Sequence, residues 1–276
     1  METSLQVLQN KYNNLISYLK KLESVAVGYS GGVDSTFLLA ASVEALGDKA
    51  IGVVGISETH SEREKKDAIE FSRKIGARLI FTKTNELEKE SFYTNPVSRC
   101  YTCKETLFKN VIEVAKKEGC LYILDGSNAD DTGDYRPGIN AAKELDVLSP
   151  LLELGFTKNE IRLLSKSMGL PSWDKPAFAC LASRVPYGSV ITSEKLSRIE
   201  NSENDLFNMG FKQLRVRDYE ELCRVEFLEN DIPVVLEKER REAIVKSLKN
   251  RGYKFVTLDL EGFRTGSMNE ILMFEK

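Results

Sequence analysis

Residues 25–35 of this 276-residue chain read VAVGYSGGVDS, and the apolar run TFLLAA follows them. An apolar strand therefore leads into a turn rich in glycine and serine, and that turn opens a helix. The free backbone N–H groups and the positive end of the helix favour binding of an anion such as phosphate. Glycine permits close approach of the backbone, and Ser30 and Ser35 add hydroxyl donors. The turn contains no Lys, so it differs from the triphosphate loop G-x-x-x-x-G-K-S/T.

The composition is that of an ordinary globular protein. Apolar residues make up 42% of the chain, and the formal net charge of −3 gives no indication of a nucleic-acid partner. No apolar run approaches the roughly 20 residues that span a membrane. Leucines at the spacing of an amphipathic helix occupy the N-terminus, which is not the pattern of a signal peptide. Five cysteines do not make a disulfide scaffold, and we expect a cytoplasmic protein.

Strand-like and helical segments alternate through the first two-thirds of the chain. This alternation predicts an α/β fold with a doubly wound, mainly parallel sheet and helices on both faces. Ligands of such sheets bind beyond the carboxyl ends of the strands, where the turn at Ser30 lies. The segments with strand character are residues 25–29, 50–56, 78–82 and 121–125.

The pattern changes after about Gly188. Two adjacent strands, a long charged helix over residues 234–249 and a final strand predict a smaller α+β unit. We therefore expect one domain over residues 1–185 and a second over residues 186–276. The long helix of the second domain could supply a face for self-association, and we expect a homo-oligomer.

Two cysteines lie close together, at Cys100 and Cys103, just before a helix predicted over residues 103–118. A helix N-terminus and the basic neighbours Arg99 and Lys104 lower thiol pKa values. Such a pair can bind a soft metal or cycle as a disulfide. Two incidental thiols in a loop are the remaining alternative.

The other three cysteines fall into two classes. Cys180 lies in a loop with prolines and cations, unlike a core strand. Cys120 and Cys223 lie in apolar runs, and we expect both to be small buried side chains. A zinc site needs four ligands. The single histidine, His60, could complete such a site, but we expect it to lie at the start of the loop before a helix. Three thiolates on an iron–sulfur cluster leave one iron open for an extra sulfide or a substrate atom.

The stretch S-G-G-V-D-S at residues 30–35 resembles the pyrophosphatase loop of the ATP pyrophosphatases, also called PP-loop proteins. Nearly the whole chain resembles the LarE-type sulfur transferases within that superfamily. Four further stretches carry this resemblance: DGSNADD at residues 125–131, DYRPG at 134–138, ACLASRVPYG at 179–188 and GFRTGSMN at 262–269.

The resemblance implies a reaction in which ATP is cleaved to AMP and pyrophosphate. ATP would adenylate a carboxylate of a pyridinium mononucleotide derived from nicotinic acid, and sulfur would then replace the adenylate. Two rounds give the dithio form that leads to the nickel-pincer nucleotide cofactor. Some relatives consume the residue matching Cys180 as sulfur donor, and those lack the pair matching Cys100 and Cys103. This chain has all three thiols, which implies the branch in which they hold a 4Fe-4S cluster with a labile extra sulfide.

The resemblance also implies where ATP and Mg²⁺ bind. The loop would hold the pyrophosphate end of ATP, and Asp34 would be a ligand of Mg²⁺. Asp130 or Asp131 could also approach the metal. The residues expected to bind the nucleotide are Gly28, Ser30, Gly31, Gly32, Asp34, Ser35, Ser127 and Asp130.

A substrate that carries its own phosphate needs a second anion site, and Arg suits bidentate recognition of phosphate or carboxylate. Arg215 and Arg217 alternate on a predicted strand and so share one face. Arg184 follows Cys180 closely, and Arg264 lies in the GFRTGSMN stretch. We expect these four to bind the substrate phosphate. The alternative for Arg215 and Arg217 is a solvated strand face paired with Glu226.

Other activities are open to a chain with these motifs. Some PP-loop relatives with three cysteines thiolate tRNA, but they usually have a basic surface, and this chain is acidic. An amidating synthetase would need no clustered thiols. A regulator that binds ATP and a cluster without turnover is the non-catalytic alternative. The three cysteines alone do not distinguish iron from zinc.

Overall fold

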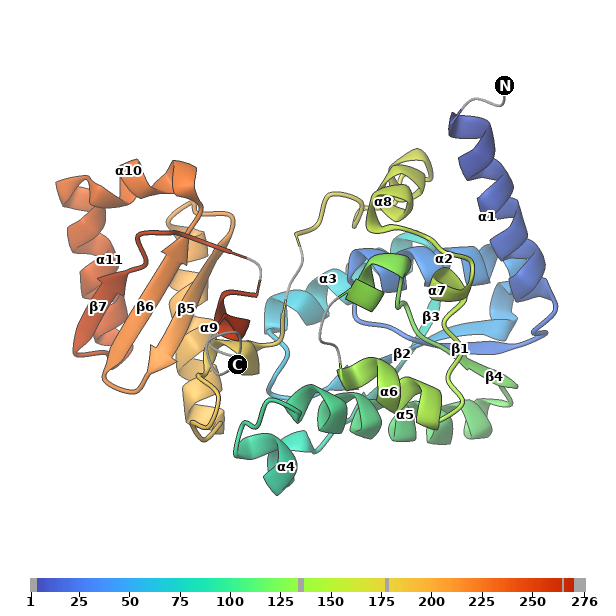
Figure 1. The fold of residues 1–276 in the computed structure, drawn as a ribbon, viewed down its shortest axis with the longest axis horizontal. Coiled ribbons are helices and arrows are strands. Elements are labelled where there is room, and N and C mark those ends of the chain that lie inside the picture. The colour runs from blue at the N-terminus through green and yellow to red at the C-terminus, as the bar shows by residue number, and fades with distance from the viewer. Residues whose placement is uncertain (1–3, 134–136, 177–178, 265, 271–276) are drawn as a thin grey trace. The chain divides into compact units, whose positions relative to one another are not determined.

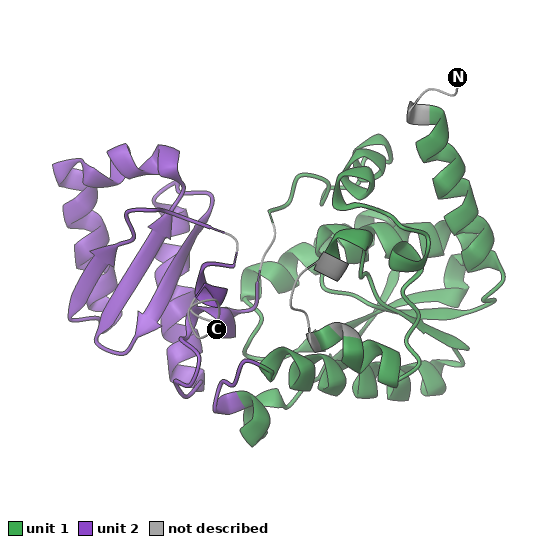
Figure 2. Ribbon diagram, in the orientation of Figure 1, with its two compact units in different colours: residues 1–92, 98–178 green, residues 93–97, 179–276 purple. Residues whose placement is uncertain are grey.

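The computed structural model describes residues 4–133, 137–176, 179–264 and 266–270. Parts of two motifs, residues 134–136 of DYRPG and residue 265 of GFRTGSMN, lie outside these ranges. The chain divides into two compact units (Figure 2). Unit 1 comprises residues 1–92 and 98–178, and unit 2 comprises residues 93–97 and 179–276. No helix among the described residues is long and apolar enough to cross a membrane.

Unit 1 contains a four-stranded sheet in which all neighbouring strands are parallel, in the order β3-β2-β1-β4 (Figure 1). This arrangement confirms the predicted α/β fold. β2 has the predicted bounds, and each of the other strands differs from prediction by one residue at one or both ends. The strands are β1 (Val25–Gly28), β2 (Ala50–Ile56), β3 (Arg78–Lys83) and β4 (Tyr122–Leu124).

Helices cover both faces of this sheet because β1 and β2 are apolar on both sides. Val25 and Val27 join one core cluster with side chains from α1, α2, α3 and α8, whereas Ala26 joins another with α5 and α6. The helices of unit 1 are α1 (Ser4–Lys20), α2 (Val33–Leu46), α3 (Glu62–Lys74), α5 (Arg99–Glu118), α6 (Pro137–Glu144), α7 (Pro150–Glu153) and α8 (Lys158–Ser167). A short helix, α4 (Glu90–Tyr93), precedes α5.

Unit 2 is the smaller α+β unit. Its sheet has the order β5-β6-β7, with β5 antiparallel to β6 and β6 parallel to β7. The predicted helix over residues 234–249 is wrong as a single element, because Glu237 has an extended backbone (φ −57°, ψ 135°) and separates two helices. The elements are α9 (Ser193–Asn208), β5 (Leu214–Tyr219), β6 (Leu222–Phe227), α10 (Ile232–Leu236), α11 (Lys238–Asn250) and β7 (Phe255–Leu258).

The units separate in the chain after residue 178, while the sequence predicts a domain boundary after residue 185. Residues 93–97 group with unit 2 through backbone contacts with the segment that follows Cys180. The side-chain amide of Asn95 donates to the carbonyl oxygens of Val185 at 3.1 Å and Pro186 at 2.6 Å. The boundary therefore depends on contacts between segments about 90 residues apart.

Candidate functional site

The glycine- and serine-rich turn connects β1 to α2 at the carboxyl edge of the parallel sheet (Figure 1). β1 ends at Gly28, and Gly32 is the N-cap of α2 without a side-chain cap. The Ser30 and Ser35 hydroxyl oxygens lie 3.1 Å apart, and Gly32 N–H donates weakly to Ser30 Oγ at 3.4 Å. The start of α2 therefore presents backbone N–H groups and two hydroxyls to an anion.

Two independent features require glycine at position 31. Its φ of +69° lies in the left-handed region, which a residue with a Cβ adopts only with strain. A Cβ at this position would lie 2.8 Å from Cα and Cβ of Ala68 on α3. The turn is thus packed against α3, and this packing sets the direction in which its N–H groups point.

We expect Gly31→Ala to lower the free energy of unfolding by about 2 to 4 kcal/mol, the sum of left-handed strain and an overpacked contact. Urea titration would measure this change, and ATP binding by calorimetry should weaken with it. Gly119→Ala is the matched control, because Gly119 has φ +70° in the left-handed region and a Cβ there would meet no atom within 4 Å. Equal destabilisation by both changes would show that the contact with Ala68 contributes nothing.

Asp34 lies in the first turn of α2, and its two carboxylate oxygens differ. Oδ2 lies 2.5 Å from Nζ of Lys158 on α8. Oδ1 is buried and has no hydrogen-bond partner among the described residues. Burial raises the pKa of Asp34, the ion pair with Lys158 opposes this rise, and the neighbouring carboxylate of Asp131 adds to it. A buried carboxylate oxygen beside a second acid fits the oxygen ligands that Mg²⁺ prefers.

The DGSNADD segment lies against this turn. A Cβ at Gly126 would lie 3.0 Å from the backbone nitrogen of Ser35, so glycine permits the close approach. Burial would raise the pKa of Asp125, but Lys104 together with hydrogen bonds from Ser149 and Ser127 lowers it overall. Asp125 therefore remains ionised and holds the segment in place.

Asp130 has a structural partner in this arrangement. Its Oδ2 accepts a hydrogen bond from the backbone N–H of Lys158 at 2.8 Å, at the start of α8. Ser127, which the sequence predicts to bind nucleotide, donates its hydroxyl to Asp125 at 2.8 Å. The structure thus brings the predicted nucleotide-binding residues of the turn and of DGSNADD together in unit 1.

Sequence reasoning missed two lysines at this site. Lys158 contacts Asp34, and Lys175, which is buried, donates to the Gly31 carbonyl oxygen at 3.2 Å and pairs with Asp67 at 2.9 Å. α8 was not predicted either, although Thr157 and Glu160 form a capping box at its start. That T-x-x-E signal, followed by apolar residues, was the feature that could have revealed the helix.

Cys100 and Cys103 both lie within α5, because this helix begins at Arg99 and not after the first thiol as predicted. They are three residues apart on a helix and therefore share one face. Cys100 is exposed and Cys103 is half-buried. The half-buried Cys180 belongs to unit 2, where it is the N-cap of a short 3₁₀ helix. Within the ranges that the structure describes, no three His, Cys, Asp or Glu side chains are arranged to hold a metal ion.

The two remaining cysteines differ in burial. Cys223 on β6 is fully buried, as expected, and burial raises the pKa of its thiol to about 12. The expectation of a buried side chain is wrong for Cys120, which lies in the loop before β4 and is half-buried. The start of β4 is more exposed than its apolar composition indicates, since Tyr122 is also exposed.

Three of the predicted phosphate-binding arginines are buried in unit 2 beside two glutamates. Arg184 pairs with both oxygens of Glu203 at 2.9 Å, and Arg217 pairs with those of Glu226 at 2.9 and 2.7 Å. Burial lowers the pKa of Arg215 to about 10, and the neighbouring charge of Arg184 contributes to this shift. Three cations and two anions leave one positive charge in excess, which favours an anionic ligand.

Arg264 has different surroundings. Its guanidinium pairs with Glu270 at 3.0 Å, and this hydrogen bond raises the pKa of Arg264. It also donates to the carbonyl oxygen of Gly262 at 3.0 Å. Arg264 is more than one-quarter exposed, unlike the three buried arginines, and its ion pair holds the turn after β7.

Comparison with known proteins agrees with these features. The family model of NAD synthase matches residues 7–102, which include the turn between β1 and α2. An uncharacterized protein of Synechocystis is 40% identical over 266 residues, covering 96% of this chain and 99% of the relative. An uncharacterized protein of Methanocaldococcus jannaschii is 30% identical over 257 residues, covering 92% and 95%.

A third relative has a named activity. The pyridinium-3,5-bisthiocarboxylic acid mononucleotide synthase of Lactiplantibacillus plantarum is 33% identical over 269 residues, and the match covers 97% of each chain. The similarity therefore includes both compact units and is not confined to the turn between β1 and α2. This chain belongs to the LarE-type family of PP-loop ATP pyrophosphatases.

Proposed function

We propose that the protein uses ATP to adenylate a carboxylate of a pyridinium mononucleotide and then inserts sulfur to give a thiocarboxylate. The observation that carries this proposal is the match to the Lactiplantibacillus synthase, which covers 97% of each chain. The product would be a precursor of the nickel-pincer nucleotide cofactor, and two rounds of the reaction would give the dithio form.

The residues of unit 1 supply what the adenylation step needs. The N–H groups at the start of α2 and the hydroxyls of Ser30 and Ser35 would bind the pyrophosphate leaving group. Asp34 would hold Mg²⁺, which neutralises charge on the phosphates when bound. A carboxylate oxygen of the substrate attacks the α-phosphorus of ATP, forming the acyl adenylate and releasing pyrophosphate.

The arginines of unit 2 are proposed to bind the substrate. Arg184, Arg215 and Arg217 carry one positive charge more than Glu203 and Glu226, so the cluster would attract the negatively charged phosphate of the substrate. Arg264 would add a more exposed cation. Binding of the phosphate far from the reacting carboxylate orients the substrate without taking part in bond making.

Cys100, Cys103 and Cys180 are proposed to bind a 4Fe-4S cluster. Thiolate is the ligand that such clusters require, and the exposure of Cys100 leaves its sulfur accessible. A cluster with three protein ligands supplies one iron that can carry a labile sulfide. Attack of a sulfur nucleophile on the acyl carbon releases AMP, and this step needs no side-chain base because sulfide is nucleophilic at neutral pH.

The proposal is tested by incubating the anaerobically purified protein with MgATP and pyridinium-3,5-biscarboxylic acid mononucleotide. We expect pyrophosphate and AMP in equal amounts, and a product whose mass reflects exchange of oxygen for sulfur. The matched control is the corresponding diamide, which has no carboxylate to adenylate. Pyrophosphate release with tRNA but not with the mononucleotide would identify a tRNA-thiolating enzyme. Binding of ATP without any turnover would identify a regulator.

A further inference from the structure

Lys158 is held beside the phosphate-binding turn by the start of α8. The capping box of Thr157 and Glu160 fixes the first turn of this helix, and Asp130 accepts the backbone N–H of Lys158 at 2.8 Å. From this position the ammonium reaches Asp34 Oδ2 at 2.5 Å, while one-third of the side chain stays exposed. The backbone of Lys158 is therefore fixed, and its long side chain can still turn towards solvent.

Asp34 can pair with Lys158 or bind a metal ion, but it cannot readily do both at the same time. Its Oδ1 is buried without a partner among the described residues, and Asp131 adds a second negative charge nearby. A divalent cation on Asp34 would lie a few ångströms from the ammonium of Lys158 and would be repelled by it. The repulsion disappears only if the ammonium moves to another anion, and the phosphates of ATP would supply one beside the N-terminus of α2.

We propose that Lys158 is the resident counterion of Asp34 and that it exchanges with Mg²⁺ when nucleotide binds. In the nucleotide-free protein the ammonium pairs with Asp34. When MgATP binds, the metal takes the carboxylate and Lys158 turns to the phosphate oxygens. Asp34 and Lys158 therefore each have a partner of opposite charge both before and after MgATP binds, and the metal and the phosphates bind cooperatively. The inference rests on the proposed use of ATP and names a residue that links its metal to its phosphates.

Lys158→Met should change two affinities in opposite directions. Without nucleotide, the variant should bind Mn²⁺, used as a spectroscopic probe, roughly tenfold more tightly, because the competing ammonium is gone. Magnesium pyrophosphate should bind about tenfold more weakly, because one charge-assisted hydrogen bond is lost. Electron paramagnetic resonance of free Mn²⁺ and isothermal titration calorimetry measure the two constants. Lys158→Arg should fall between wild type and Lys158→Met in both.

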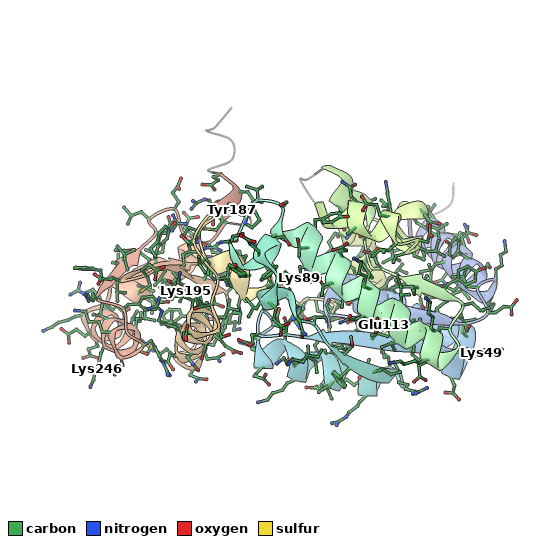
Figure 3. All side chains as sticks on the ribbon, turned by 90° about the horizontal axis from the view of Figure 1, so that it is seen from below. Lys49, Lys89, Glu113, Tyr187, Lys195 and Lys246 are labelled. Atoms are coloured by element: carbon green, nitrogen blue, oxygen red, sulfur yellow. The ribbon has the colours of Figure 1, made fainter. Side chains whose placement is uncertain are left out.

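The matched control is Lys49→Met. Lys49 is exposed and lies just before β2, at the amino end of the strands (Figure 3). We expect it to leave both affinities unchanged. Weaker binding of both Mn²⁺ and pyrophosphate in Lys158→Met would indicate damage to the site and overturn the exchange, as would unchanged pyrophosphate binding. Neither constant depends on sulfur transfer, so absence of thiocarboxylate product would contradict the proposed function and leave the result for Lys158 standing.

Discussion

We expect wild-type protein to bind about four irons per chain, and we expect Cys100→Ala, Cys103→Ala and Cys180→Ala each to lose iron, acid-labile sulfide and thiocarboxylate formation. This is the largest effect we expect, because a cluster with two remaining thiolates loses a ligand that no other side chain replaces. Iron and sulfide would be measured in protein purified without oxygen. Pyrophosphate release should persist in all three variants, because the nucleotide-binding residues belong to a separate set.

Cys120→Ala is the matched control, because Cys120 is half-buried like Cys103 and Cys180 but lies outside the proposed set. It should retain iron and activity.

A wild-type protein with little iron, even after reconstitution, would contradict the cluster. Mass spectrometry of wild type after one turnover would then distinguish the alternatives. Conversion of Cys180 to dehydroalanine would identify a sacrificial sulfur donor, and bound zinc would identify a structural metal site.

Asp34→Asn should lower kcat/KM for pyrophosphate release about a thousandfold. The amide retains the shape of the side chain but loses the charge that would hold Mg²⁺ against the phosphates, and preorganised charge of this kind is typically a large term in catalysis. Initial rates at saturating MgATP and at limiting mononucleotide separate effects on binding from effects on chemistry. The control is Asp48→Asn, at an exposed acid just before β2.

The stability of Asp34→Asn distinguishes loss of function from loss of fold. Burial raises the pKa of Asp34, so its ionised form is less favourable in the folded state than in the unfolded one. This group therefore contributes stability at pH below its unfolded pKa and loses that contribution as pH rises through its folded pKa. At neutral pH the neutral amide should not lower the thermal unfolding midpoint. A lower midpoint would mean that loss of fold contributes to the loss of activity, and kcat/KM within tenfold of wild type would contradict a catalytic role for Asp34.

Local sequence patterns were sufficient for most of the elements of unit 1. The apolar run of β2 was predicted with its observed bounds, and the turn before α2 was located by its glycines and serines. The early start of α5 was missed because Arg99 and Cys100 have no helix signal of their own; Ser98 precedes the helix without a side-chain cap. The break at Glu237 is not evident in the sequence because residues 237–242 are all charged and include no Gly or Pro to signal an interruption.

The candidate site likewise contains residues that local sequence identifies and residues that only packing brings together. Gly31 and Asp34 could be predicted, because the strand, the turn and the helix N-terminus lie next to one another in the sequence. Lys158 could not, because it is 124 residues from Asp34 and approaches it only when α8 packs beside α2. Arg217 pairs with Glu226 as the alternative for this strand face predicts, but the face is buried and not solvated.

The sequence by itself determined the parallel α/β fold, the position of the glycine- and serine-rich turn and membership in the LarE-type family of PP-loop proteins. These depend on hydrophobic periodicity and on short motifs whose residues act together within one turn of chain. Only the tertiary structure decided which charges meet: Lys158 with Asp34, Lys175 with Asp67, and Arg184 with Glu203. Ion pairs between distant segments follow from how helices and strands pack, and packing depends on contacts along the whole chain.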